Sequence, residues 1–400
     1  MSESSREAQH AAAPDQPAAD RQPEALESVV LAAMPPLGRL YALAARRSAV
    51  RAGTGLLASG PGRLLAHRPR PGVGGSEDRA RRRGGTGPRV EPAPELPRVQ
   101  IVVPEVTVEP GAHAEFCRVV GAPLRSRPDG SVEAFSGYLH ALAFPAAMAL
   151  LTRRDFPLPV VGLVHLANSV HHVRPVAVGQ RLGVTVRAQR LRAHRAGTAF
   201  DVVTELRAQD GGAPVWTGSS TYLARGVRLP QVSAQASSRV SSHASPQAPF
   251  QASSGADGAS RPVFVAPEPT GRWSLPGDTG RRYARVSGDV NPIHLSAVSA
   301  RALGLEAAIA HGMFTASRAL AALEAPAPLD WDVEFAAPLV LPGRPAVAVR
   351  RDGRGDGFVA GEVTVWDRRR ARPHAVVTAR RPPQPPPAPP AQRVPSGGRA

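Results

Sequence analysis

The sequence contains no lysine, so all 49 of its strongly basic side chains are arginines. Isoleucine and asparagine are nearly as scarce, with three and two copies, and aromatic residues make up 4% of the 400 residues. Residues encoded by AT-rich codons are therefore depleted as a group. Codon bias is the simplest explanation for much of the arginine-based net charge of +17.

A single cysteine, Cys117, excludes an intramolecular disulfide and fits a reducing compartment. The sequence also lacks a long uninterrupted apolar run. Its most apolar N-terminal stretch, 26–45, is broken by Pro35, Pro36 and Arg39 and lies too far from the start to be a signal peptide. No membrane partner is expected, and without a targeting signal the expected location is the cytoplasm.

Proline and glycine are abundant, with 43 and 38 copies, which indicates linkers and tails between folded blocks. A chain of this length accommodates two or three domains. We expect a mostly disordered region over 1–95 with one short helix at 35–46, folded blocks over 96–228 and 263–381, a flexible linker over 229–262 and a disordered proline-rich tail over 382–400.

The segment 63–89 concentrates arginine against only two acidic residues, Glu77 and Asp78. Such a segment is either a basic disordered arm or a footprint for a polyanion. No nucleic-acid-binding module accompanies it, so nucleic acid is not an expected partner.

Both folded blocks follow one pattern, an apolar helix followed by several strands. In the first block, Pro145 is tolerated only in a first helical turn, so we predict a helix that starts near Phe144. Strands are predicted at 99–108, 162–174, 181–191, 198–208 and 215–223. In the second block a helix is predicted at 312–323, with strands at 331–335, 344–350, 358–366 and 374–378.

The two blocks also share sequence. Phe116–Gly121 matches Tyr283–Gly288, and His140-Ala141 matches His311-Gly312. A helix that is apolar on most sides needs cover all round, which a curved antiparallel sheet supplies. Two such sheets bury each other's free edges by pairing. The prediction is an α+β tandem double hotdog, in which each antiparallel sheet wraps around a long central helix and the units pair within one chain. A homodimer is also allowed.

Only the second block carries groups for acid–base chemistry. After Gly288 comes Asp289-Val-Asn291-Pro292-Ile-His294, whereas Gly121 is followed by Ala-Pro-Leu-Arg. Asn291 is a favoured N-cap and Pro292 fits a first helical turn, which places His294 in that turn and Asp289 just before it. The two side chains can then act on one water. Singly, each fits an ordinary helix-start residue, but together they indicate a site.

Gly312 begins the next helix, where free N–H groups favour developing negative charge and a glycine allows close approach of a carbonyl. Other candidates are weaker. His171 and His172 face opposite sides of a strand, no Cys/His cluster has zinc spacing, and Cys117 sits in a helical, packed position. Ser287 and Ser317 lack a nucleophile-elbow context.

The segment from Tyr283 to His294, followed by Ile309-Ala-His-Gly-Met313, resembles the MaoC-like, R-specific enoyl-thioester hydratases (hydratase 2). The first block, with Gly137-Tyr-Leu-His140 and Gly162-Leu-Val-His165, is similar to the N-terminal hotdog of actinobacterial double-hotdog (3R)-hydroxyacyl-thioester dehydratases. The likeness covers roughly 35–45 and 96–380. The insertion over 53–97, the long linker and Gly137 depart from the family pattern, outside the site.

The resemblance implies reversible syn addition of water to a trans-2-enoyl thioester of coenzyme A or acyl carrier protein in fatty-acid metabolism, without metal or other cofactor. Asp289 and His294 would activate the water, and Gly312 with Asn291 would bind substrate. The first block would be non-catalytic and would shape the acyl tunnel. Two alternatives remain: a hotdog thioesterase, and a non-catalytic acyl-binding partner of a hydratase.

Overall fold

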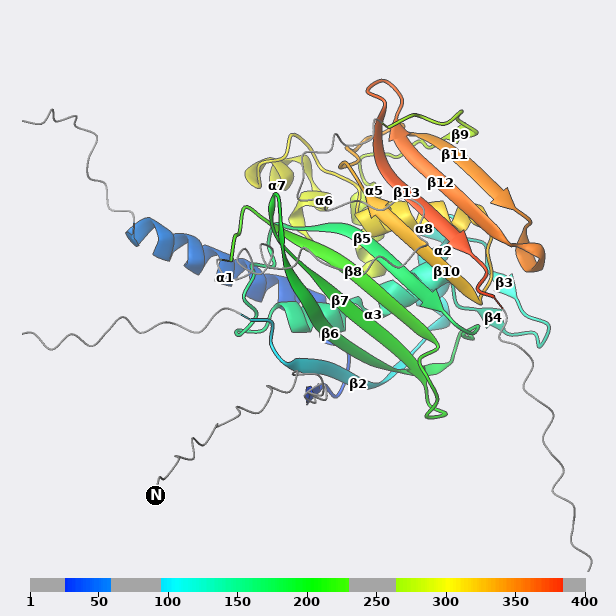
Figure 1. The fold of residues 1–400 in the computed structure, drawn as a ribbon, viewed down its shortest axis with the longest axis horizontal. Helices are drawn as coiled ribbons and strands as arrows, with labels where there is room; N and C mark the ends of the chain where they lie inside the picture. Colours follow the sequence, from blue (N-terminus) through cyan, green and yellow to red (C-terminus); the bar gives the residue numbers. More distant parts are fainter. Residues whose placement is uncertain (1–25, 59–94, 230–263, 384–400) are drawn as a thin grey trace, which may run out of the picture.

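The computed structural model describes residues 26–58, 95–229 and 264–383. Eleven strands form one mixed sheet in the order β1-β2-β6-β7-β8-β5-β10-β13-β12-β11-β9, and helices pack against it (Figure 1). Only β1 and β2 pair in parallel; the other neighbours are antiparallel. Together with the helices, this sheet makes the described part of the chain an α+β fold.

The first block contributes the elements that end at residue 225. They are β2 (Val99–Thr107), α2 (Pro110–Val120), the short hairpin β3 (Arg125–Ser126) and β4 (Val132–Glu133), α3 (Ser136–Leu151), β5 (Leu163–His172), β6 (Arg181–His194), β7 (Gly197–Ala208) and β8 (Trp216–Arg225). The helix α3 packs against β2, β6 and β7. Val184 and Val186 alternate with less buried neighbours along β6 and so present one face of the sheet to the core.

The prediction that the apolar helix starts near Phe144 was wrong, because α3 begins at Ser136 and contains Pro145 in its interior. A proline there removes one backbone hydrogen bond. However, α3 is apolar all round, and residues from every side of it are buried, including Leu139, Ala146 and Leu150. Burial on all sides outweighs the loss of one hydrogen bond.

The second block repeats the pattern. It contains β9 (Gly271–Arg272), α5 (Thr279–Ser287), α6 (Pro292–Leu295), α7 (Ala297–Ala302), α8 (Gly312–Leu323), β10 (Leu329–Phe335), β11 (Ala346–Asp352), the 3-10 turn η1 (Gly355–Gly357), β12 (Ala360–Asp367) and β13 (Arg372–Arg380). The helix α8 packs against β11, β12 and β13, and it also contacts α3.

The two blocks meet where β5 pairs with β10, from Leu329 opposite His172 to Glu334 opposite Ala167. At this junction the indoles of Trp216 and Trp331 both donate a hydrogen bond to the hydroxyl oxygen of Ser136, at 3.1 and 2.9 Å. All three side chains are buried. One serine at the start of α3 therefore ties together strands from both blocks.

The sequence repeat is only partly reflected in the structure. Helices α2 and α5 both end at a left-handed glycine, Gly121 (φ 76°) and Gly288 (φ 72°), whose N–H bonds back to the carbonyl four residues earlier. The match of His140-Ala141 with His311-Gly312 was wrong, because His311 precedes α8 whereas His140 lies inside α3. Alanine-rich helices look alike when shifted along their axis, so sequence alone misaligned them.

The N-terminal segment contains more structure than expected. Here β1 (Glu27–Val30) pairs with β2, and α1 (Leu37–Ala58) starts two residues after the predicted helix start and continues well past its predicted end at 46. The guanidinium of Arg47 donates to the carbonyls of Thr152 and Arg154 at 2.8 and 2.9 Å, which anchors α1 beyond the end of α3. The rest of the region predicted as disordered, nearly all of the linker and most of the tail lie outside the described residues. Within the described ranges, no helix combines the length and apolar character needed to cross a membrane.

Candidate functional site

The segment after α5 carries Asp289 in a loop and His294 in the short helix α6. Gly288 ends α5, Asn291 caps α6 by accepting the N–H of Ile293 at 3.4 Å, and Pro292 opens α6. The predicted N-cap and first-turn proline are thus confirmed. His294 follows within the single turn of α6, and His311 is the residue that precedes α8.

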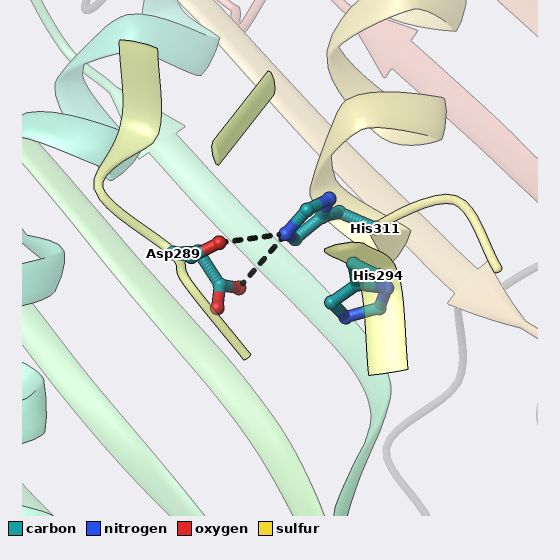
Figure 2. Close-up of side chains that lie close together, drawn as sticks. All are labelled: Asp289, His294 and His311. Atoms are coloured by element: carbon teal, nitrogen blue, oxygen red, sulfur yellow. Dashed lines mark hydrogen bonds and ion pairs between the residues drawn. The ribbon is translucent and has the colours of Figure 1, made fainter. Parts of the chain in front are cut away.

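Three side chains converge at this point: Asp289, His294 and His311 (Figure 2). Their potential ligand atoms all lie within 4.8 Å of one another. The ring of His311 stacks on that of His294 at a centroid distance of 3.7 Å. His311 Nε2 donates to the backbone carbonyl of Asp289 at 2.9 Å and lies 3.9 Å from its carboxylate.

The Asp289 carboxylate is held from two further directions. The Tyr41 hydroxyl in α1 donates a hydrogen bond to Oδ1, and the backbone N–H of Asn291 donates to the same oxygen at 3.2 Å. The carboxylate side chain nevertheless keeps 23% of its surface exposed. Asp289 is therefore fixed in place and still reachable by water.

His294 is fixed through its other ring nitrogen. Nδ1 lies 2.8 Å from the carbonyl oxygen of Ile309, and since a carbonyl only accepts, Nδ1 carries the proton. This tautomer leaves a lone pair on Nε2. A backbone contact thus sets both the orientation of the imidazole and the nitrogen that can accept a proton.

Electrostatics favour a charged carboxylate beside neutral imidazoles. Burial would raise the pKa of Asp289, but the positive charge that His311 or His294 carries when protonated, the Tyr41 hydroxyl and the Asn291 amide together hold it below its usual value. Burial lowers the pKa of His294, although Asp289 and the Ile309 carbonyl oppose this effect. Burial and the neighbouring His294 lower the pKa of His311 to about 3. At neutral pH the site holds an anionic acceptor next to an imidazole base.

Gly312 lies where sequence analysis placed it, at the start of α8. A Cβ at this position would lie 3.2 Å from the ring of Phe335, so glycine leaves room that another residue would fill. No side chain caps the start of α8. Its first N–H groups have no partner within the helix and are suited to a developing oxyanion.

A wall of side chains from the first block lies near Asp289. The ring of His165 stacks on that of Tyr222 with a centroid distance of 4.6 Å. Its centroid also lies 5.1 Å from that of Phe335, in the second block, and 6.3 Å from that of His140. Burial lowers the pKa of His140 to about 4 and that of His165 to about 3, and the Asp289 carboxylate is close enough to act on both. The wall is uncharged at neutral pH.

Sequence reasoning missed Tyr41 and His311 as members of this cluster. His311 was quoted only as the neighbour of Gly312, although a histidine directly before a helix start was a usable signal. Tyr41 lies 248 residues from Asp289 along the chain. Only its place in the predicted helix 35–46 hinted at an ordered role.

The three clustered residues also form a set that could hold a metal ion. His294 and His311 each donate one ring N–H to a backbone carbonyl and retain one lone pair, a pattern common to metal ligands and to general bases.

The other candidate residues of the sequence do not form a second site. Burial raises the pKa of the Cys117 thiol to about 12, and the Ser287 hydroxyl donates a hydrogen bond to the Tyr283 carbonyl. Neither is an activated nucleophile. His171 is exposed and His172 buried, which confirms that they face opposite sides of β5.

Comparison with known proteins gives a consistent result. The family model described as "MaoC like domain" matches residues 264–367. The chain is 32% identical over 308 residues to 3-hydroxyacyl-thioester dehydratase X of Mycobacterium tuberculosis, covering 76% of this chain and 98% of that protein. Two crystal structures of HtdX from the same organism are 30% and 31% identical, with TM-scores of 0.54 and 0.53. They cover 71% and 70% of this chain, and the alignments span 100% and 99% of those chains.

Proposed function

The chain belongs to the MaoC-like dehydratase family and is thus a hydro-lyase, and we propose that it interconverts (3R)-3-hydroxyacyl and trans-2-enoyl thioesters. The observation that carries the proposal is the pairing of an anchored, water-accessible Asp289 carboxylate with the free Nε2 of His294. A histidine that only took part in an ordinary helix start would not need its tautomer fixed by the Ile309 carbonyl.

In the hydration direction, Asp289 accepts a hydrogen bond from the water and orients it over C3 of the enoyl thioester. His294 Nε2 takes one proton of that water as its oxygen bonds to C3. The C2–C3 π electrons move toward the thioester oxygen, which the N–H of Gly312 at the start of α8 stabilises. His294 then returns the proton to C2. The hydroxyl and the proton arrive from the same face, so the addition is syn.

Asn291 serves this arrangement through its cap of α6, which fixes the loop between Asp289 and His294. We further infer that the chain is a tandem double hotdog, with a non-catalytic unit over 96–228 and a catalytic unit over 263–381. Two observations support this assignment. Strand β5 pairs with β10, and helices α2 and α5 both end at a left-handed glycine. The wall containing His140, His165 and Tyr222 then forms one side of the acyl site.

The direct test is hydration of crotonyl-CoA and longer trans-2-enoyl-CoAs by the full chain, followed through loss of the enoyl absorbance. We expect a 3-hydroxy product of R configuration on chiral analysis, no free thiol, and the same rate after treatment with a chelator. Release of thiol instead would identify a thioesterase. An S product would contradict the proposed geometry.

The pH dependence follows from the directions of the pKa shifts. His294 acts as the neutral base and Asp289 as the anion, and both have lowered pKa values. Protonation of either therefore stops the reaction only on the acid side. Burial raises the pKa of Tyr41, so its hydroxyl stays protonated in alkaline solution. We expect kcat/KM to stay level from about pH 6.5, the ordinary pKa of histidine, to about 9 and to fall at lower pH. A decline between pH 7 and 9 would contradict this assignment.

A further inference from the structure

A guanidinium without an acidic partner lies where α2, α5 and α8 meet. Arg318 is the only charged residue among the twelve of α8, whose other side chains are apolar or carry a small hydroxyl. The Nε atom of Arg318 is buried and has no hydrogen-bond partner within the described part of the chain. A buried charged donor without a partner is costly, so this side chain requires compensation from another group.

The groups that surround Arg318 attract a cation only weakly. Its guanidinium lies over the Trp273 ring, 5.1 Å from the ring centroid. On another side its Nη1 atom would lie 3.8 Å from a Cβ at Gly121, the residue that ends α2. An indole face and the C-terminal end of a helix both favour positive charge. Neither supplies a full negative charge.

A second arginine, Arg282 of α5, adds positive charge beside Arg318. Phe314 and Arg318 lie one turn apart on α8, and the Phe314 ring meets that of Tyr283, the neighbour of Arg282, at a centroid distance of 5.7 Å. Burial and the nearby Arg282 together lower the pKa of Arg318. Asp278, at the N-cap of α5, forms an ion pair with neither arginine within the described residues.

This lack of pairing contrasts with a buried ionic group in the first block. There the fully buried carboxylate of Asp201 accepts hydrogen bonds from Arg190, Arg192 and Thr221, the last two at 3.0 and 2.7 Å. At the junction of α2, α5 and α8, by comparison, Arg282 is exposed and Arg318 is half-buried. Both positive charges are therefore open to a ligand from solvent.

We propose that Arg282 and Arg318 bind a small, doubly charged oxyanion of the phosphate type, with Trp273 and the end of α2 beside it. Planar guanidinium groups bind such oxygens in pairs, and the anion supplies the charge that the surroundings lack. It would join α5, whose end leads to Asp289, to α8, which starts at Gly312. Helix α2 packs against both (Figure 1). The Asp289 cluster takes no part, so this inference does not depend on the proposed function.

The test is a calorimetric titration of the full chain with inorganic phosphate, in a buffer free of other oxyanions and at an ionic strength held constant with chloride. Arg318→Gln and Arg282→Gln remove one charge each and keep a side chain that can donate hydrogen bonds. Arg350→Gln is the matched control, because Arg350 is an exposed arginine of β11, outside this junction.

We expect one phosphate per chain with a Kd of about 1 mM or tighter. Arg318→Gln should weaken binding at least about tenfold, because charge-assisted hydrogen bonds are lost, and Arg282→Gln should weaken it less. The Arg282 variant changes an exposed residue, so it keeps the test valid if Arg318→Gln does not fold. No binding would overturn the proposal. Equal loss in all three variants would also overturn it, since it would show unspecific attraction to a chain of net charge +17.

Thermal unfolding provides a second readout. Phosphate at a hundredfold excess over Kd should raise Tm by at least about 3 °C, because it binds only the folded chain. Arg318→Gln should lose this increase, whereas Arg350→Gln should keep it. Phenyl phosphate then distinguishes the two sources of such an anion: exclusion of this ester would identify the free anion as the ligand, and equal or tighter binding would admit phosphate esters. Binding of either compound that survives Arg318→Gln would contradict the proposed site.

Discussion

Asp289→Asn is expected to lower kcat/KM by about 10³-fold, within the range contributed by a positioned acid–base group. The amide keeps the shape of the carboxylate, and its oxygen can still accept from Tyr41 and from the N–H of Asn291. The negative charge, which we propose orients the water and stabilises a protonated His294, is lost. Steady-state hydration of crotonyl-CoA measures the effect.

His294→Ala removes the proposed base, and we expect a loss of similar size. The double variant should be little worse than either single variant, because in the proposed mechanism the two groups act on one water as a unit. Asp332→Asn and His171→Gln provide matched controls. Asp332 is an exposed residue of β10 and His171 an exposed residue of β5, and neither belongs to the Asp289 cluster. Melting temperatures separate loss of activity from loss of fold. Full activity in either catalytic variant would rule out the mechanism.

Much of the site was predictable because its geometry is encoded locally. Asn291 and Pro292 specify a helix start through backbone chemistry that needs no tertiary context, and they place His294 relative to Asp289. The long strands were predictable for the same kind of reason, since alternation of buried and exposed residues is a property of each strand alone. The structure agrees closely with these local predictions.

The misses share a different cause, because each depended on contacts between distant parts of the chain. Pro145 reads as a helix start until the packing around α3 is known. His140 resembles His311 until the two helix starts are compared. Tyr41 carries no local signal for its hydrogen bond to a loop of the second block, 248 residues later in the chain. A local reading also treated most of α1 as disordered.

Tyr41→Phe is expected to reduce kcat/KM by about 10- to 100-fold and to move the acid limb of the pH profile to higher pH. Loss of a hydrogen bond to a charged group is worth about 1.5–3 kcal/mol, which sets this range. The Tyr41 hydroxyl bonds to the ionised form of Asp289 and so lowers the pKa of that carboxyl. Without the hydroxyl this pKa rises, and Asp289 becomes protonated at a higher pH than before.

The direction of the pH shift distinguishes positioning from mere structural support. Tyr138→Phe is the control, because Tyr138 is a buried tyrosine of the first block and belongs to a cluster with His113 and Phe116. A structural role for Tyr41 would lower activity with the acid limb unmoved. A shift in Tyr41→Phe alone would show that a helix from outside both repeated blocks sets the charge on the carboxylate. The segment 37–58 would then be part of the enzyme's working site, and its removal should reproduce the shift.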